Sequence, residues 1–420
     1  MKKKTLLIIA YYFPPVGMSG TQRVAKFAKY LPENGWQAVV LTVKPILYFS
    51  LDKSLLQDIG DTPVIRTESL DPQRILYRFG KRKKTAAAGR SAGLLNLNKV
   101  LSFFCLPDLK RLWHLHAMQV VRKLHKQYRF DAVFSTSPPH SVHLLARHIS
   151  GKYQIPWIAD FRDSWSGGVV VQEPTWFHRY MNKRLQRSVV KRADAVIGVT
   201  TGIIDQLLLD NEKKFYYIPN GFDPDDYPKA NRRAKRQVVF CHCGSVTKFS
   251  HPGPLLEAIQ LLLKRKPDLK TILLFQFVGY DALGNFRDMV RQFGLDQVVQ
   301  VISYKSHRQA LQYVVDADAL VLIARGRKED RFIPGKTYEY IGAQKNILAI
   351  TDVAEIRQLL SAIPGATRVA YGDAEKIAET IEFILTKSKD LYLENNIDLS
   401  LYNRRHQTAE LAAVLDSVIR

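Results

Sequence analysis

Short apolar segments alternate with amphipathic segments along nearly the whole chain, and this order constrains the fold more strongly than any other feature. In the first half, Thr5–Ala10 and Ala38–Thr42 are apolar, and Thr21–Glu33 between them has helical spacing of its apolar residues. A second alternating series begins with Val238–Cys243 and Thr271–Val278. Strands that alternate with helices predict parallel sheets covered by helices on both faces. The sequence therefore predicts an α/β protein with two doubly wound, Rossmann-like domains.

The composition changes near the middle of the chain. Asn220–Pro228 is rich in turn-forming residues, and Asn231–Arg236 is basic and polar. A chain of 420 residues is also long enough for more than one domain. We therefore expect an N-terminal domain over residues 1–222, a linker over 223–236 and a C-terminal domain over 237–400.

The net charge of +23 implies an anionic partner, which can be nucleic acid, an anionic membrane face or a phosphorylated substrate. Basic residues crowd the stretch between Arg74 and Lys126, where Leu and Phe are interleaved with them. We expect residues 70–130 to begin as irregular basic sequence and to continue as a helix from about Leu109 to Gln127. Basic residues beside Leu and Phe favour docking on an anionic membrane surface, and a solvated basic loop beside a packed helix is the alternative. No recognised nucleic-acid motif is present, so we expect no nucleic-acid partner.

The chain has no apolar run of about 18 residues, so we expect no membrane-spanning helix. The apolar run Leu6–Ala10 is too short for a signal peptide, and Tyr11–Pro15 after it does not resemble a cleavage region. Three cysteines give no disulfide framework, which suits the cytoplasm. In Cys241-His242-Cys243, strand alternation places the two sulfurs on one face and the imidazole on the other, so buried core cysteines are a simpler interpretation than a metal site.

The segment Ile333–Ala343 predicts a turn followed by a short helix. Gly335 allows a close approach of the backbone, and Lys336 lies in the first helical turn, where exposed N–H groups and an ammonium favour an anion. Glu339 lies three residues further on and hence near the same helix face. A cation for phosphate beside a carboxylate for sugar hydroxyls suits a nucleotide-sugar pocket. The alternative is a plain helix N-terminus with an exposed lysine and glutamate.

Two loops in the first half follow predicted strands and hold further candidates. Gly17 and Gly20 lie after the first strand, where small residues let backbone N–H groups approach a phosphate or sugar, or simply make a turn. Ser137–His140 follows another strand, and its prolines stiffen the loop. His140 can donate to a sugar hydroxyl or to developing charge, with His143 as a weaker candidate, although a lone histidine is usually structural.

Asp160-Phe161-Arg162-Asp163 ends a further predicted strand. Its two carboxylates and guanidinium can hold the hydroxyls of an acceptor, or they can form a buried ion-pair network with one another. Asp163 has the chemistry of a catalytic base.

These motifs together resemble the family 4 (GT4-like) glycosyltransferases of the two-domain GT-B fold, and especially bacterial enzymes of lipopolysaccharide and surface-polysaccharide synthesis. The likeness covers nearly the whole chain in order. The motifs that carry it are Tyr11–Pro15, Gly17–Arg23, Pro107-Asp108, Phe130-Asp131, Ser135–Ser141, Trp157–Trp165, Ala193–Val196, Ile218–Asp223, Gly244-Ser245, Asp316–Asp318 and Ile333–Tyr340. The resemblance also implies that residues 401–420 contain a last helix that packs back on the first domain.

The resemblance implies roles for particular residues. The second domain would bind the nucleotide-diphosphate sugar through Gly244, Ser245 and Gly335, with Lys248 and Lys336 as a cationic pair for the diphosphate. Lys248 is offset from the position where relatives carry arginine, which here is Ser250. Arg325 would add positive charge to the donor pocket.

Relatives also carry two glutamates separated by seven residues. Glu339 matches the second, which would bind ribose hydroxyls. Arg331 stands at the position of the first, and Glu329 and Asp330 are out of register. This departure leaves open a changed donor or a loss of activity.

The first domain would bind the acceptor through Asp160, Arg162 and Asp163. His140, Lys336 and Asp163 are the candidate catalytic residues. The expected activity is a hexosyltransferase that retains the anomeric configuration, uses no metal or cofactor, and works at the inner face of the plasma membrane on a lipid-linked glycan. The alternatives are a nucleotide-sugar epimerase of the same fold, a non-catalytic basic protein that binds membrane or nucleic acid, and an inactive partner subunit.

Overall fold

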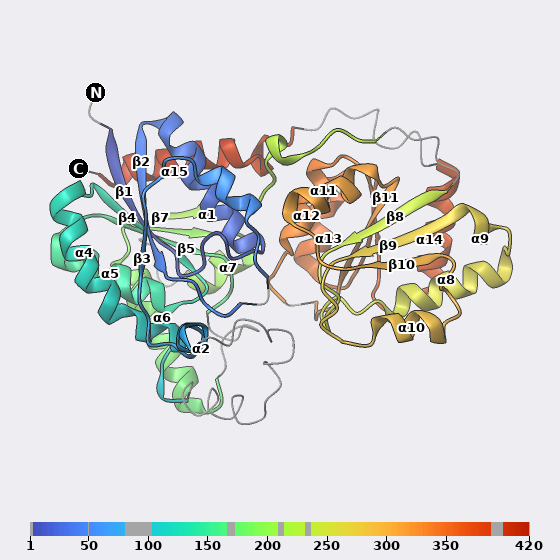
Figure 1. The fold of residues 1–420 in the computed structure, drawn as a ribbon, viewed down its shortest axis with the longest axis horizontal. Helices are drawn as coiled ribbons and strands as arrows, with labels where there is room; N and C mark the ends of the chain where they lie inside the picture. The colour runs from blue at the N-terminus through green and yellow to red at the C-terminus, as the bar shows by residue number, and fades with distance from the viewer. Residues whose placement is uncertain are drawn as a thin grey trace. The chain divides into compact units, whose positions relative to one another are not determined.

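The chain divides into two units, and Figure 1 colours the chain from blue at the N-terminus to red at the C-terminus. Unit 1 comprises Met1–Asn220 and Arg404–Arg420, and unit 2 comprises Gly221–Asn403. The computed structural model describes residues 3–48, 50–79, 103–165, 173–208, 214–231, 237–328, 330–387 and 398–419. None of the helices in these ranges combines the length and the apolar character that crossing a bilayer requires.

Within the described part of unit 1, parallel strands form one sheet in the order β3-β2-β1-β4-β5-β6-β7. The strands are β1 (Lys4–Ile9), β2 (Trp36–Val43), β3 (Val64–Thr67), β4 (Ala132–Ser137), β5 (Trp157–Phe161), β6 (Ala195–Gly198) and β7 (Lys214–Tyr217). The α-helices are α1 (Ser19–Tyr30), α2 (Pro72–Arg78), α4 (His114–Tyr128), α5 (Ser141–Tyr153), α6 (Trp176–Arg192), α7 (Thr201–Leu207) and α15 (Arg404–Val418). Short 3-10 helices are η1 (Leu31–Asn34), η2 (Ser54–Ile59) and η4 (Leu109–Trp113).

The alternation of side chains along β1 explains why helices cover both faces of this sheet. Leu6 and Ile8 belong to one apolar cluster, which includes residues of α1 and α15. Leu7 and Ile9 belong to the other, which includes residues of α4 and α5. Successive strand residues point to opposite faces. The side chains on both faces of an unbroken apolar strand are therefore buried, each face under its own layer of helices.

The C-terminal helix α15 packs on unit 1, as the resemblance predicted. Leu411 and Leu415 lie in the same apolar cluster as Leu6. At the end of the helix, the Asp416 carboxylate accepts a hydrogen bond from Lys4 Nζ at 2.7 Å. The last helix of the chain therefore completes the core around the first strand.

Unit 2 has a second parallel sheet, with the order β10-β9-β8-β11-β12-β13 in its described part. The strands are β8 (Val238–Cys243), β9 (Leu273–Val278), β10 (Val299–Ile302), β11 (Ala319–Ala324), β12 (Asn346–Thr351) and β13 (Ala366–Val369). The helices are α8 (Gly253–Arg265), α9 (Leu269–Ile272), α10 (Phe286–Gln292), α11 (His307–Asp316), α12 (Gly335–Gly342), α13 (Ala354–Ser361) and α14 (Ala374–Lys387), with 3-10 helices η5 (Pro224–Asp226) and η6 (Ser400–Tyr402).

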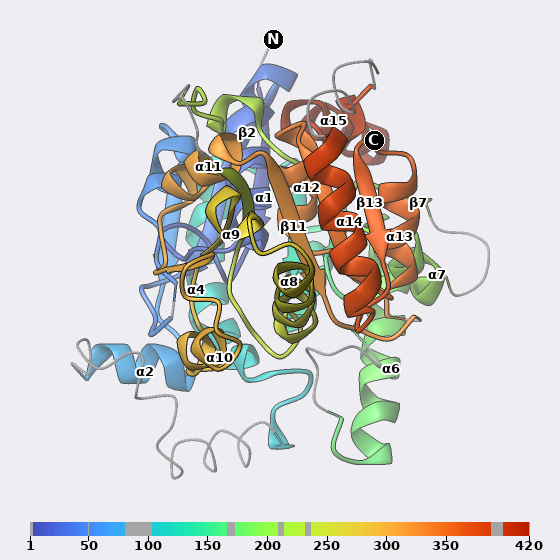
Figure 2. The same cartoon turned by 90° about the vertical axis from the view of Figure 1, so that its right-hand side faces the viewer.

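Two helical layers cover this sheet as well. On one face, α8 and α14 lie side by side (Figure 2), and Phe240 of β8 belongs to the cluster that they complete. On the other face, Cys241 and Cys243 lie in the apolar cluster with residues of α12 and α13. Both cysteines are therefore core residues, in agreement with the simpler interpretation of the Cys-His-Cys segment. The two sheets together confirm the predicted α/β fold.

In both sheets the strand order reverses beside the first strand of the unit. In unit 1, β1 pairs with both β2 and β4. In unit 2, β8 pairs with both β9 and β11. Ligands of open parallel sheets bind outside the carboxyl ends of the strands at such a reversal. The loops after β1, β4, β8 and β11 are therefore the places where functional residues are expected.

The basic stretch of unit 1 is more ordered at its start than the sequence predicted. Residues 72–78 form α2 rather than an irregular segment, because the Asp71 carboxylate caps the helix by accepting from the Gln73 backbone N–H at 3.0 Å. Arg74 pairs with Glu68 at 2.8 Å, and Lys110 pairs with Asp71 at 2.9 Å. Lys81, Arg82, Lys83, Lys84, Arg90 and the Leu-rich residues 94–101 lie outside the described residues.

Candidate functional site

Lys336 lies where the first turn of α12 meets the end of β8. Its Nζ lies 3.1 Å from His242 Nε2, and His242 Nδ1 lies 2.9 Å from the carbonyl oxygen of Val321. The carbonyl can only accept, so Nδ1 carries the proton and Nε2 accepts from the ammonium. Burial and the neighbouring ammonium lower the pKa of His242 well below its ordinary range. A neutral imidazole therefore positions the lysine without cancelling its charge.

Burial also lowers the pKa of Lys336, from its ordinary value to about 8, while Cys243 and Glu339 partly oppose this shift. The side chain is only partly exposed, so its ammonium has lost much of its water and gains strongly from an anion. At neutral pH the group remains mostly protonated. The structure thus places a poorly solvated cation at the carboxyl edge of the sheet, beside the strand reversal.

Gly244 is needed for this arrangement for a reason that the sequence did not show. A Cβ atom at this position would lie 2.5 Å from Lys336 Nζ, and the residue has a φ of 140°. Any larger residue would therefore displace the lysine as well as strain the backbone. The sequence analysis predicted a role for Gly244 at the ligand, and the structure adds that the missing side chain makes room for the cation.

Glu339 lies one helical turn from Lys336 and is held by residues that the sequence analysis missed. Its Oε1 lies 2.9 Å from His307 Nε2, at the start of α11. The hydroxyl of Tyr227 donates to the Glu339 carbonyl oxygen at 2.7 Å. No sequence pattern marks His307 or Tyr227, because both reach Glu339 only through the tertiary structure. Thus α12 has a fixed carboxylate close to its fixed ammonium.

The other expected donor residues surround this centre more loosely. The carbonyl of Ser245 accepts from the Ser250 hydroxyl at 2.7 Å, so Ser250 shapes the loop after β8. Lys248 is exposed, with its ammonium 4.9 Å from the centre of the Phe249 ring. Arg325 is exposed too, and its backbone N–H donates to the Phe249 carbonyl at 2.6 Å. The loops after β8 and β11 are therefore joined, while Lys248 and Lys336 contact different partners.

The positions before α12 differ from the paired glutamates of the resemblance. Arg331 is exposed. The Asp330 carboxylate accepts from the Arg327 backbone N–H at 2.8 Å and so belongs to a local turn. Glu329 lies outside the described residues. Gly335 begins α12.

In unit 1, the carboxylate of Asp160 at the end of β5 forms a fully buried ion pair with Arg23 of α1. Arg23 Nη2 lies 2.8 Å from Asp160 Oδ1, and neither side chain is exposed to solvent. The Thr136 hydroxyl donates to the same carboxylate at 2.6 Å, and Arg23 also donates to the carbonyl oxygens of Ile218 and Pro219. Asp160 therefore joins α1, β4 and the end of the Met1–Asn220 segment. The sequence analysis considered a buried ion-pair network here but placed it within residues 160–163.

Arg162 is held against the loop that follows β4. Its guanidinium donates to the carbonyl oxygens of Ser137 at 3.0 Å and Pro138 at 2.9 Å. A Cβ atom on Gly20 would collide with this guanidinium. The Gly17 N–H donates to the Ser50 carbonyl at 2.9 Å, so this group is already satisfied within the protein. Gly20 thus allows the loops after β1, β4 and β5 to meet around one cation.

Asp163 is partly buried and differs from Asp160 in its electrostatics. Burial raises its pKa to about 6, although Arg162 opposes the shift. No described residue donates a hydrogen bond to its carboxylate. A carboxyl group with a raised pKa and free hydrogen-bonding capacity can accept from, or exchange a proton with, a hydroxyl near neutral pH.

His140 and His143 are both buried at the start of α5. Burial lowers the pKa of His140 to about 3, and the ring stacks on Trp165 with centroids 4.8 Å apart. His143 Nδ1 lies 2.8 Å from the Ser135 hydroxyl, which itself accepts from Trp157 Nε1. The hydroxyl proton therefore goes to His143 Nδ1, and Nε2 carries the ring proton. Both imidazoles are neutral, and within the described residues the backbone of Ser164 is the one hydrogen-bonding group beside the His140 ring.

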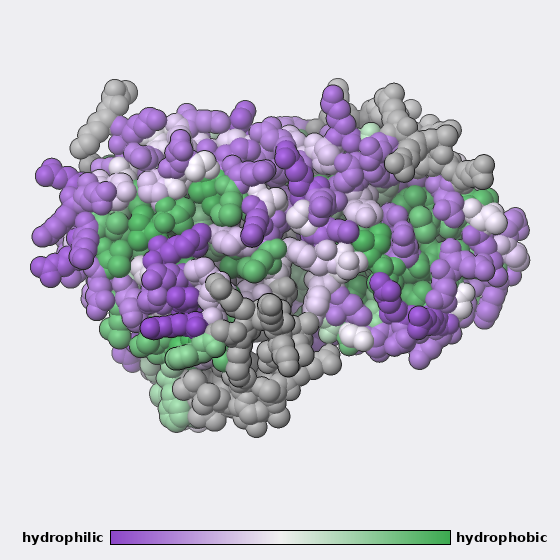
Figure 3. All heavy atoms as spheres, viewed as in Figure 1, coloured by the Kyte–Doolittle hydropathy of each residue, from purple (hydrophilic) through white to green (hydrophobic). Residues whose placement is uncertain are grey.

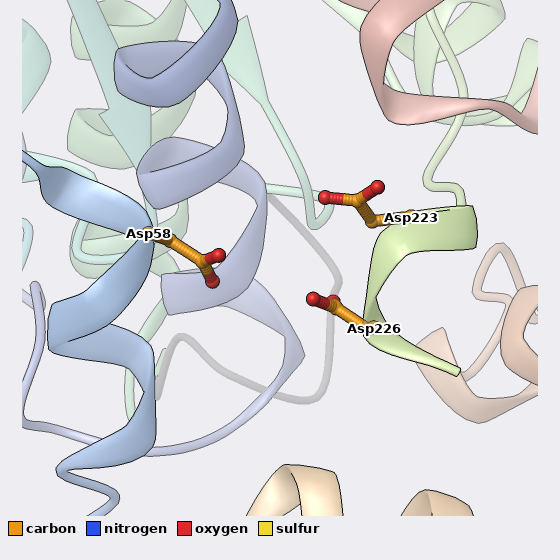
Figure 4. Close-up of side chains that lie close together, drawn as sticks. All are labelled: Asp58, Asp223 and Asp226. Carbon is orange, nitrogen blue, oxygen red and sulfur yellow. The ribbon is translucent and has the colours of Figure 1, made fainter. Parts of the chain in front are cut away.

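Figure 4 shows three aspartates that the sequence analysis did not single out as sites. Asp58 belongs to unit 1, where it accepts from Lys26 Nζ at 2.9 Å. Asp223 and Asp226 belong to unit 2, where Asp223 caps η5. Asp226 Oδ2 lies 3.9 Å from His307 Nδ1, so η5 also helps to fix the histidine that holds the carboxylate of α12.

Two Rossmann-like α/β units, each with its polar residues at a strand reversal, define the GT-B class of fold. Residues 20–221 match the family model described as Glycosyl transferase 4-like domain. Most of the sequence of unit 1 is therefore similar to a glycosyl transferase 4-like domain. The sequence matches no curated protein at a significant level.

Solved structures with the same fold cover nearly the whole chain. Alr3699/HepE of Anabaena, in complex with UDP-glucose, has a TM-score of 0.60 at 13% identity, covering 99% of this chain and 96% of that one. The lipopolysaccharide outer core galactosyltransferase WaaB has a TM-score of 0.60 at 12% identity, covering 99% of both chains. A UDP-N-acetylglucosamine 2-epimerase has a TM-score of 0.53 at 12% identity, covering 97% of this chain and 91% of that one. At these identities the likeness shows the fold alone.

Proposed function

We propose that the protein is a retaining glycosyltransferase that moves a hexose from a nucleotide-diphosphate sugar to a hydroxyl of a lipid-linked glycan. The pathway would be the synthesis of a bacterial cell-surface polysaccharide of the lipopolysaccharide type, at the cytoplasmic face of the membrane. The match of residues 20–221 to a glycosyl transferase 4-like domain supports the class of reaction. The positioned ammonium of Lys336 carries the argument for the donor.

Lys336 fits the diphosphate of such a donor. The ammonium lies in the first turn of α12, and the N-terminus of a helix also favours an anion. It is partly desolvated, and the neutral His242 leaves its charge uncompensated. Glu339 lies within one turn and offers a fixed acceptor for ribose hydroxyls. Unit 2 would therefore bind the nucleotide sugar through Lys336 and Glu339, with the backbone of Gly244, Ser245 and Gly335 lining the same edge.

Unit 1 would bind the acceptor. Asp163 has a carboxylate with no hydrogen-bond donor among the described residues, and Arg162 lies beside it. His140 is neutral, and the ring nitrogen that does not face the Ser164 backbone is available for a sugar hydroxyl. Asp160 would act through Thr136 and Arg23, by holding the end of β5, rather than by touching the acceptor.

In the proposed reaction the acceptor oxygen bonds to the anomeric carbon as the bond from that carbon to the diphosphate breaks. The negative charge that develops on the leaving diphosphate is stabilised by Lys336 and the N–H groups of α12. The hydroxyl proton passes to a phosphate oxygen of the donor, so the protein needs no residue on the opposite side of the sugar. Positioning of the hydroxyl by the residues of unit 1 supplies most of the remaining rate enhancement.

Thermal unfolding in the presence of UDP-, GDP-, ADP- and dTDP-sugars tests the donor proposal. One donor should raise the midpoint of unit 2 unfolding, because a ligand that binds only the native state stabilises it. Lys336→Ala and Glu339→Ala should each remove the shift. Lys264→Ala, which changes an exposed lysine of α8, should leave it intact. An unchanged shift in Lys336→Ala would refute the phosphate role of this residue.

The product of the reaction separates the proposal from the epimerase alternative, because a UDP-N-acetylglucosamine 2-epimerase shares the fold at a TM-score of 0.53. NMR spectra of the stabilising donor incubated alone should show no change in the sugar configuration. With a lipid-linked glycan added, they should show a new glycosidic bond with the anomeric configuration of the donor. If the sugar of the donor changed its configuration without an acceptor, the protein would be an epimerase and not a transferase.

A further inference from the structure

The first turns of α6 expose a cluster of aromatic side chains on unit 1. Trp176 is 80% exposed, Phe177 48% and Tyr180 53%. The neighbouring segment adds Phe103, 45% exposed, and Phe104, 77% exposed. Figures 1 and 2 show this end of α6 projecting beyond the sheet of its unit, and Figure 3 shows hydrophobic surface around it. We call these five residues the aromatic tip.

Ring contacts hold the aromatic tip together. The rings of Phe103 and Phe104 lie 5.3 Å apart between centroids, and Phe103 lies 4.5 Å from the ring of His178. His178 Nε2 also lies 2.9 Å from the Phe103 carbonyl oxygen, which ties the segment to α6. Phe177 continues the contacts to Trp176 at 6.2 Å. A soluble protein does not ordinarily expose so many contiguous aromatic side chains unless something covers them.

The remainder of α6 is cationic and has no acidic residue. Its exposed face continues from Trp176 and Tyr180 into basic residues along successive turns. The basic residues of the helix are Arg179, Lys183, Arg184, Arg187, Lys191 and Arg192. Among the described residues, the carboxylate of Glu173 lies 3.8 Å from the guanidinium of Arg179 and partly neutralises the positive charge of the first turns.

We propose that the aromatic tip and the basic face of α6 dock unit 1 on an anionic membrane surface. Trp and Tyr prefer the headgroup region, where the ring is apolar and the polar edge remains hydrated. Basic side chains just behind them would meet the anionic headgroups, each adding to the affinity. A second copy of this chain fits less well, because two cationic helices would then face each other.

The position of the surface suits the proposed acceptor. α6 is the helix that follows β5, so its first turn lies toward the carboxyl edge that holds Arg162 and Asp163. A glycan attached to a lipid would reach unit 1 from this edge. The sequence analysis placed the docking surface at residues 74–126, but Arg74 and Lys110 of that stretch are paired with Glu68 and Asp71.

Tryptophan fluorescence tests this surface directly. The chain has five tryptophans, and four of them (Trp36, Trp113, Trp157 and Trp165) are fully buried. A change of tryptophan environment on vesicle binding therefore reports Trp176. With the full-length protein, we expect a blue shift of emission on adding vesicles of phosphatidylcholine with phosphatidylglycerol, little with phosphatidylcholine alone, and a loss of the shift at high salt.

Variants separate the two components of the surface. Trp176→Ala/Phe177→Ala should weaken cosedimentation with the anionic vesicles on the order of tenfold. Lys183→Glu/Arg184→Glu should weaken it similarly while leaving Trp176 in place. Lys264→Glu/Lys270→Glu makes the same change of charge at exposed lysines of unit 2 and should have little effect. All these side chains are exposed, so thermal melting should be unchanged.

The outcomes are distinct from those of the donor test, because vesicle binding is measured without any nucleotide sugar. The proposal is overturned if the wild-type protein does not bind anionic vesicles. It is also overturned if both α6 variants bind these vesicles as well as the wild type does. A dimer that Trp176→Ala/Phe177→Ala dissociates assigns the surface to a second copy instead. A Trp176 response to RNA but not to vesicles assigns it to nucleic acid.

Discussion

The buried ion pair between Arg23 and Asp160 gives the sharpest prediction, since the sequence assigned Asp160 to the acceptor and the structure gives it a structural role. In Asp160→Ala, the guanidinium of Arg23 stays buried with only the carbonyl oxygens of Ile218 and Pro219 as partners. Removal of one partner of a buried pair costs about 3–5 kcal/mol. The Thr136 hydroxyl also loses its acceptor, at a cost of about 1 kcal/mol. We therefore expect the free energy of unfolding of unit 1 to fall by about 4–6 kcal/mol.

The tryptophans make this measurable for unit 1 alone. All five lie in this unit, at positions 36, 113, 157, 165 and 176. Urea unfolding followed by tryptophan fluorescence thus monitors unit 1 even when unit 2 unfolds separately. Asp160→Asn retains an oxygen for Thr136 but loses the charge, so we expect a smaller loss of about 2–3 kcal/mol. Asp163→Asn is the matched control and should change the stability by less than about 1 kcal/mol, because no described residue donates to that carboxylate.

A double variant tests the reasoning further. Arg23→Met/Asp160→Leu removes both charges, and it should be more stable than either single variant, because no isolated charge remains buried. The reasoning would be refuted by an Asp160→Ala protein that unfolds at the same urea concentration as the wild type. If that variant were as stable as the wild type but had a raised KM for the acceptor, Asp160 would be assigned to acceptor binding.

Further predictions concern the residues at the strand ends. Lys336 has a pKa of about 8 in the folded protein against an ordinary value of 10.5, so donor affinity measured by calorimetry should fall as the pH rises above 8; constant affinity up to pH 10 would contradict the charge role. Because the pKa of Lys336 is lower in the folded protein, unit 2 binds fewer protons than the unfolded chain between pH 8 and 10.5. Below pH 8 the lysine is charged in both states, and the cost of burying its charge disfavours folding. The melting temperature of Lys336→Met at pH 7 should therefore be no lower than that of the wild type. Gly244→Ala should abolish the donor-induced thermal shift. The control is Gly294→Ala, where φ is 67° and an added Cβ atom has no neighbour within 4 Å, and this variant should melt at a lower temperature but keep the shift. Equal shifts in the two variants would show that Lys336 does not need the space beside Gly244. Asp163 has a pKa of about 6, so the transferase rate should fall as the pH drops through 6. Asp163→Asn should lose that limb of the pH profile while donor binding is retained, because only the ionised carboxylate accepts well from the acceptor hydroxyl. An unaltered profile would exclude the charge of Asp163 from holding the acceptor.

The sequence determined the two-sheet α/β fold and most of the elements, because the information is local. An unbroken apolar strand such as β8 followed by an amphipathic helix such as α8 has few alternatives to a parallel sheet with helices on both faces. The missed α2 was also local, since Asp71 followed by Pro72 is a helix-start pattern. Resemblance to known motifs supplied the expectation that α15 returns to unit 1, which periodicity could not have given.

The partners of the candidate residues were decided only by the tertiary structure. Arg23 and Asp160 are 137 residues apart, and His242 and Lys336 are 94 apart, so no periodicity connects them. The sequence showed that a lysine begins a helix, but the neutral imidazole that positions it, the glycine that makes room for it and the burial that lowers its pKa come from β8 folding against α12. The sequence likewise showed a basic α6, while the exposure of Trp176 follows from where the first turn of that helix lies relative to its sheet. Charges and apolar residues can be read along a chain, but their desolvation depends on which distant segments pack around them.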